Sequence, residues 1–205
     1  MANLGNLYVI AAPSGTGKTS LVKALLDSMP KITVSISHTT RTKRPNEEDG
    51  KHYHFVEKNE FNQMIIRGDF LEYATIFDHY YGTSKSWVEQ TLHGGMDVIL
   101  EIDWQGHQQI KRLFPHCISI FILPPSLADL RNRLQSRNQD HPDSIEKRLA
   151  DAQETVRHVH EFEYIIINGN FDSALNDLKM IVEVGRLSHD RQTAEHAQLI
   201  ASLEG

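Results

Sequence analysis

Short apolar runs alternate along the chain with segments in which apolar residues recur at helical spacing. The runs at 98–102 and 118–123 are nearly continuous, as in strands covered on both faces of a sheet. Further strands are expected up to residue 12, at 32–36 and at 164–167. Helices are expected at 18–29, before Pro115, after Ser126, after Asp143 and around 175–182. This alternation predicts an α/β fold with a central parallel sheet flanked by helices.

Residues 37–93 interrupt the alternation. They contain polar loops, extended runs at 53–56 and 71–77, and two segments with helical spacing around 61–65 and 87–92. This change of pattern predicts an inserted α+β subdomain within one domain.

Composition and charge narrow the class of protein. The chain has 205 residues, a formal net charge of −6 and one cysteine, Cys117, which excludes an internal disulfide. The negative charge argues against a nucleic-acid partner, whereas basic residues gathered at 41–51 and 131–148 suit small anionic ligands. We expect a cytoplasmic protein with no membrane partner, because the chain shows neither a signal peptide nor a membrane span.

The most informative local motif follows the first strand, in LYVIAAPSGTGKTS at residues 7–20. Its spacing is that of a Walker A loop, in which backbone N–H groups surround phosphate oxygens. In such a loop, Lys18 would bridge the β- and γ-phosphates of ATP, and the Thr19 hydroxyl would bind Mg²⁺. Ala12 stands where the first glycine is usual. The predicted ATP-binding residues here are Ala12, Pro13, Ser14, Gly15, Thr16, Gly17, Lys18, Thr19 and Ser20.

A second motif, SHTTRTKRPNEEDGKHYHFV at 37–56, resembles the signature of guanylate kinases. FLEYA at 70–74, YYGTS at 80–84, EIDWQG at 101–106 and IIING at 165–169 resemble the same family, in the same order, so the resemblance covers almost the whole chain. It implies a P-loop nucleoside-monophosphate-kinase fold. The core would comprise 1–36, 94–128 and 151–205, the GMP-binding subdomain 37–93 and a helical lid 129–150.

The resemblance also implies how GMP is bound. Guanidinium and phenol groups would hold the acceptor phosphate, Glu72 and Thr83 would recognise guanine, and Asp103 would serve both GMP and Mg²⁺. Glu101 occupies a position where the family usually has aspartate. The implied GMP-binding residues are Ser37, Arg41, Arg44, Tyr53, Glu72, Tyr81, Thr83, Glu101 and Asp103.

The lid would close over the triphosphate with its arginines. Arg133 and Arg137 lie four residues apart, on one face of a helix, and Arg148 follows the polar link 138–142. Asn168 and Arg133 are assigned to ATP. The residues implied in catalysis are Lys18, Arg41, Arg137 and Arg148.

These assignments predict transfer of the γ-phosphate of Mg-ATP to GMP, and to dGMP, with ATP and GMP as small-molecule substrates. Two alternatives fit these residues less well. A non-enzymatic scaffold module would typically lose Lys18 or the lid arginines, and a kinase for a ribose bisphosphate would have no use for Glu72 and Thr83. The sequence leaves open whether the chain forms a homo-oligomer and whether the tail from Ser188 packs on the core, contacts another subunit or frays.

Overall fold

The structure is a computed structural model that describes residues 4–76, 78–136 and 142–205. Its central sheet has five strands in the order β2-β7-β1-β8-β9, and every neighbouring pair is parallel. The strands are β1 (Leu7–Ala11), β2 (Ile32–Val34), β7 (Asp97–Glu101), β8 (Ile118–Leu123) and β9 (Tyr164–Ile167). The predicted α/β class with a central parallel sheet is confirmed.

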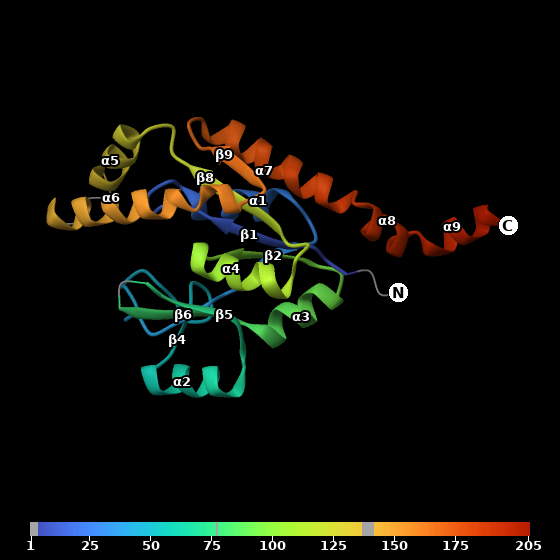
Figure 1. Ribbon diagram of the computed structural model, residues 1–205, viewed down its shortest axis with the longest axis horizontal. Coiled ribbons are helices and arrows are strands. Elements are labelled where there is room, and N and C mark those ends of the chain that lie inside the picture. The colour runs from blue at the N-terminus through green and yellow to red at the C-terminus, as the bar shows by residue number, and fades with distance from the viewer. Residues whose placement is uncertain (1–3, 77, 137–141) are drawn as a thin grey trace.

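Helices cover both faces of this sheet (Figure 1). Along β1, Tyr8 and Ile10 pack with apolar residues of α1 (Lys18–Ser28) and α7 (Phe171–Arg186). Val9 points to the opposite face, where α3 (Lys85–His93) and α4 (Trp104–Leu113) contribute to the core. The runs at 98–102 and 118–123 lack polar alternation because both faces of β7 and β8 are buried.

A second sheet has four strands in the order β4-β3-β6-β5. Its strands are β3 (His38–Thr39), β4 (His54–Phe55), β5 (Phe70–Ile76) and β6 (His79–Ser84), accompanied by α2 (Lys58–Arg67). Helix α4 contacts both β1 and β5, so it joins the two sheets.

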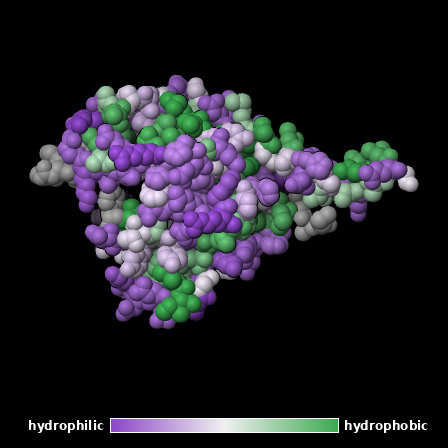
Figure 2. Space-filling model, in the orientation of Figure 1, coloured by the Kyte–Doolittle hydropathy of each residue, from purple (hydrophilic) through white to green (hydrophobic). Residues whose placement is uncertain are grey.

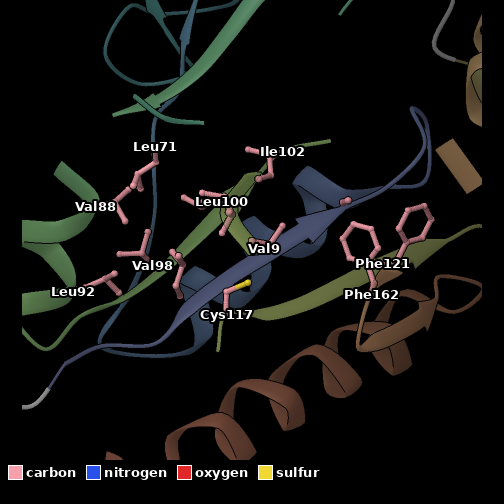
Figure 3. Close-up of a cluster of buried hydrophobic side chains, with 13 residues drawn as sticks. Val9, Leu71, Val88, Leu92, Val98, Leu100, Ile102, Cys117, Phe121 and Phe162 are labelled. Carbon is pink, nitrogen blue, oxygen red and sulfur yellow. The ribbon is translucent and has the colours of Figure 1, made fainter. Parts of the chain in front are cut away.

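The inserted segment also shares the main hydrophobic core. Leu71, Val88 and Leu92 belong to the same buried cluster as Val9 and Phe121 (Figure 3). Burying an aliphatic side chain of this size contributes about 1.5–3 kcal/mol to stability. Strand β5 is therefore anchored to the core one residue before Glu72.

The lid segment contains α5 (Leu127–Ser136) and α6 (Pro142–Arg157), which precede the short helix η1 (Val159–Glu161). Leu130, Leu134, Leu149 and Ala152 form a small core of their own between the two helices. The predicted Arg137 and most of the polar link 138–142 lie outside the described residues.

The C-terminal tail forms α8 (His189–Glu195) and α9 (Ala197–Glu204), which project beyond α7 (Figure 1). Leu199 and Leu203 of α9 are 56% and 78% exposed, and apolar surface is visible on the projecting end (Figure 2). Of the three options left open by the sequence, packing on the core is wrong for α9.

Within the described ranges, no helix is both long and apolar enough to span a bilayer.

Candidate active site

The parallel register brings the phosphate loop, residues 12–19, next to the acidic segment 101–103. Strand β1 pairs with β7 so that Ile10 lies opposite Glu101. Both segments leave the carboxyl edge of the sheet, which is where ligands bind in open α/β folds.

Backbone geometry makes the phosphate loop a suitable anion site. Gly15 and Gly17 have φ values of 93° and 94°, in the left-handed region that disfavours residues with a Cβ. Gly17 is the N-cap of α1, and no side chain caps the helix there. The first amides of α1 are thus left for a bound phosphate, to which the helix dipole is also favourable. Ala12 is not among the residues with positive φ.

Two side chains from distant segments hold this loop. Asn168 Nδ2 donates to the Thr16 carbonyl at 2.7 Å, and Arg133 Nη1 donates to the same oxygen at 3.1 Å. Arg133 Nη2 also donates to the Asn168 carbonyl at 2.8 Å. Arg133 and Asn168, both predicted to bind ATP, therefore lie at the loop and contact its backbone. In the same region, Arg148 of α6 donates to Ser14 Oγ at 2.8 Å.

The acidic segment contributes two carboxylates with different contacts. Glu101 Oε1 accepts a hydrogen bond from Thr19 Oγ1 at 3.2 Å. Asp103 instead caps α4, accepting from the Gly106 amide at 2.9 Å and from Gln105 Nε2 at 3.0 Å. Of the two acids, Glu101 is therefore the one that contacts the Thr19 hydroxyl, which is predicted to bind Mg²⁺.

Lys18 lies partly buried between these segments. Burial lowers the pKa of its ammonium, and the negative charges of Glu101 and Asp103 partly oppose this shift. An ammonium in such a position is stabilised by additional negative charge, which a triphosphate supplies.

Of the four residues predicted to clamp the acceptor phosphate, Arg41, Tyr53 and Tyr81 lie close together. Arg44 is exposed and is connected to them through its backbone amide. The Arg41 guanidinium lies 5.4 Å from the Tyr53 ring centroid, and the Tyr53 and Tyr81 rings are 5.9 Å apart. Glu47 organises this group, accepting from Arg41 Nη2 at 2.7 Å and from the Arg44 amide at 2.9 Å. The hydrogen bond from Arg41 to Glu47 raises the pKa of Arg41, so this guanidinium stays charged.

Glu72 and Thr83 form a buried polar pair on adjacent strands. They are opposite each other in the register of β5 and β6, and Thr83 Oγ1 donates to Glu72 Oε1 at 2.5 Å. Glu72 is only 3% exposed, and burial raises its pKa to about 7. The Thr83 hydrogen bond opposes this shift, whereas the nearby charge of Asp103 adds to it. A carboxylate has about four acceptor sites, so the pair retains capacity for a ligand with adjacent N–H donors.

Comparison with known proteins shows the family to which the chain belongs. Residues 4–184 match the family model described as guanylate kinase. The chain belongs to the guanylate kinase family. A guanylate kinase of Vibrio vulnificus (strain YJ016) is 51% identical over 201 residues, 97% of both chains. One from Dechloromonas aromatica (strain RCB) is 53% identical over 195 residues, 95% of this chain and 96% of that one.

A solved guanylate kinase also shares the fold. The crystal structure from Anaplasma phagocytophilum is 29% identical, with a TM-score of 0.78 over 92% of this chain and 90% of that chain. The resemblance inferred from the motifs is therefore confirmed for both family and fold.

Within the candidate site, the charges of two acids act on groups in both predicted pockets. The charge of Asp103 acts on both Lys18 and Glu72, and the charge of Glu101 acts on both Lys18 and Tyr53. Burial raises the pKa of Tyr53, and its neighbours Tyr81 and Glu101 raise it further. The two acids therefore lie between the phosphate loop and the predicted GMP-binding residues.

Sequence reasoning left several contacts of this guanylate kinase site unassigned. Glu47 was noted only as part of the family signature, although an acid within a basic segment is a signal for an internal ion pair. Gly106 was not given a role, yet a Cβ there would lie 2.5 Å from Glu72 Oε2. Ser37, predicted to touch the phosphate, helps to pair β3 with β4 through its carbonyl, which accepts from the His54 amide at 2.9 Å.

Proposed function

We propose that the chain transfers the γ-phosphate of ATP to the phosphate of GMP, giving ADP and GDP. Family membership supports this activity. The single observation that carries the geometry is the placement of the segment 101–103. Glu101 accepts from Thr19 at the phosphate loop, and Asp103 accepts from the amide of Gly106, which lies against Glu72 in the predicted base pocket. A donor and an acceptor nucleotide bound at these places would bring their phosphates together.

The residues present account for the reaction through positioning and charge. The attacking phosphate oxygen of GMP is already anionic at neutral pH, so no general base is needed. Arg41, Arg44, Tyr53 and Tyr81 would orient the acceptor phosphate, and Lys18 would stabilise charge on the transferring group. Closure of the lid, with Arg148 beside the loop, would exclude water as a competing acceptor.

Glu72 and Thr83 provide a chemical basis for choosing guanine. The ionised Glu72 carboxylate can accept from the ring N–H and the 2-amino group of guanine. The single hydroxyl hydrogen of Thr83, which is donated to Glu72 in the structure, would have to turn away from Glu72 to reach the 6-carbonyl. Adenine offers an acceptor at the position of that ring N–H and has no 2-amino group, so it would leave a buried carboxylate without donors. This mismatch would select against AMP.

We base the fit for magnesium on Thr19 and Glu101. Asp103, the acid that the sequence assigned to Mg²⁺, is used as the cap of α4. The oxygens of Thr19 and Glu101 are hydrogen-bonded to each other, and hard oxygen ligands are those Mg²⁺ prefers. Among the described residues, no group of three or more histidine, cysteine, aspartate or glutamate side chains could hold a metal. The protein would thus supply few ligands, and the nucleotide phosphates and water the others. Bound there, Mg²⁺ would neutralise charge on the phosphates.

Glu101→Gln tests this assignment. Removing the negative charge beside Thr19 should raise the Mg²⁺ concentration that gives half-maximal rate by about tenfold, which corresponds to roughly the free energy of one charged hydrogen bond. The measurement is the initial rate at saturating nucleotides over a magnesium titration. Glu60→Gln, at an exposed position of α2, is the control. An unchanged magnesium midpoint in Glu101→Gln would remove Glu101 from the metal site.

A substrate panel tests the proposed activity itself. Purified protein with Mg-ATP should release ADP rapidly when GMP is the acceptor and slowly when AMP, CMP or UMP is the acceptor. A coupled assay measures the rate of ADP release. The scaffold-module alternative predicts GMP binding without turnover, and the ribose-bisphosphate alternative predicts no preference for GMP. Retention of Gly15, Gly17, Lys18, Thr19 and Arg148 favours the enzyme.

The division into core, GMP-binding subdomain and lid is part of this proposal, with the boundaries given above. Use of dGMP and a cytoplasmic location stay predictions of the sequence, which leaves self-association open.

A further inference from the structure

Gln109 of α4 pairs with the backbone of β5 as a neighbouring strand would. The Tyr73 amide donates to Gln109 Oε1 at 3.2 Å, and Gln109 Nε2 donates back to the Tyr73 carbonyl at 2.8 Å. Strand β5 is at the edge of its sheet, so this side of it has no strand partner. One carboxamide from the core thus satisfies a donor and an acceptor of the inserted sheet, 36 residues away in the sequence.

Tyr73, the residue that Gln109 holds, directly follows Glu72 in β5. Helix α4 also contacts Glu72 itself. Asp103 caps the helix, and Gly106 leaves room for the carboxylate, since a Cβ there would lie 2.5 Å from Glu72 Oε2. Residues 103, 106 and 109 are spaced by three and so follow one side of the helix. The same side of α4 therefore contacts β5 at two successive residues.

We propose that Gln109 is a positioning residue for guanine: by holding the backbone of Tyr73 it sets the place of the Glu72 carboxylate over Gly106 and beside Asp103. The proposal rests on the proposed function and adds a determinant of base selectivity to it. Leu71, 5% exposed, keeps β5 attached to the core from the residue before Glu72, so the strand does not depend on Gln109 to stay folded. Gln109 instead limits the movement of the strand along the helix.

Gln109→Met tests this role, because methionine has a similar length but neither hydrogen bond. Displacement of the base-binding carboxylate by a fraction of an ångström should raise KM for GMP by about tenfold or more. KM for ATP should not change. The rate ratio of GMP to IMP, which lacks the 2-amino group, should fall, because the carboxylate no longer meets that group correctly. GMP affinity measured by calorimetry should fall in parallel.

Gln108→Met is the matched control on the same helix. Gln108 Nε2 donates to Glu161 at 3.0 Å, away from β5, so this change removes a hydrogen bond of similar kind without touching the base pocket. Equal effects of the two variants on KM for GMP and on the ratio of GMP to IMP would overturn the proposal. So would a Gln109→Met variant that lowers only the melting temperature. A wild-type protein that fails to phosphorylate GMP would instead contradict the proposed function.

Discussion

Lys18→Ala should lower kcat for GMP phosphorylation by about a thousandfold or more, the scale expected when a charged donor to the transferring group is removed. The ammonium lies partly buried between Glu101 and Asp103, where burial lowers its pKa. In this position its main contribution is charge directed at a bound triphosphate. The rate is measured in the coupled assay at saturating ATP, GMP and Mg²⁺.

The fold should survive this change, because the apolar residues that attach α1 to the sheet, among them Leu21 and Leu25, are unaffected. Circular dichroism and thermal unfolding check this point. Lys23→Ala, on the exposed part of the same helix, should retain nearly full activity. A loss of less than tenfold in a folded Lys18→Ala protein would show that Lys18 does not stabilise the transferring phosphoryl group.

GMP binding should weaken about tenfold between pH 8 and pH 6, because the fraction of ionised Glu72 falls by that factor around a pKa of about 7. Only the ionised carboxylate accepts both guanine N–H groups. The stability of the fold should change in the opposite direction, falling as the pH rises. The folded chain holds this proton up to about pH 7, whereas the unfolded group releases it near 4.5, so Glu72 makes unfolding easier as pH rises through that interval. KM for GMP and calorimetric affinity, each measured against pH, give the first effect.

Glu72→Gln separates this group from other titrations. The variant should lose about a hundredfold to a thousandfold in kcat/KM for GMP, since a buried pocket built for a carboxylate now presents an amide donor to guanine. Its remaining GMP affinity should be nearly flat between pH 6 and 8. A wild-type affinity for GMP that is the same at both pH values would refute the assignment of Glu72 to the base.

The sequence predicted the elements whose signals are local. The apolar run before the glycine loop, the helical spacing after Lys18 and the alternation of strands and helices correspond to β1, α1 and the parallel sheet. Strand β6 was not predicted, because HYYGTS has neither apolar alternation nor a continuous apolar run. In the tail, the helical spacing of Ala197, Ile200 and Leu203 corresponds to α9. Helix α8 was not predicted, because its Arg191 is held by a distant partner, the buried Asp97, that no local pattern indicates.

The detailed contacts of the site depend on tertiary geometry. The sequence placed Glu101 and Asp103 at the end of one strand, but it could not show which would contact Thr19, because Asp103 is used as a helix cap. Likewise, Gln109 resembles any polar residue on a helix surface until β5 is placed beside it. Such pairings follow from how the inserted sheet docks on α4.

The most direct test of the central claim is calorimetric titration with a dinucleotide in which adenosine and guanosine are joined through five phosphates. If the phosphate loop and the GMP-binding residues face one another across Glu101 and Asp103, one molecule should bind per chain, at least about a hundredfold more tightly than ATP or GMP alone. Either nucleotide should compete with it. Affinity no greater than that of ATP, unaffected by added GMP, would contradict the account.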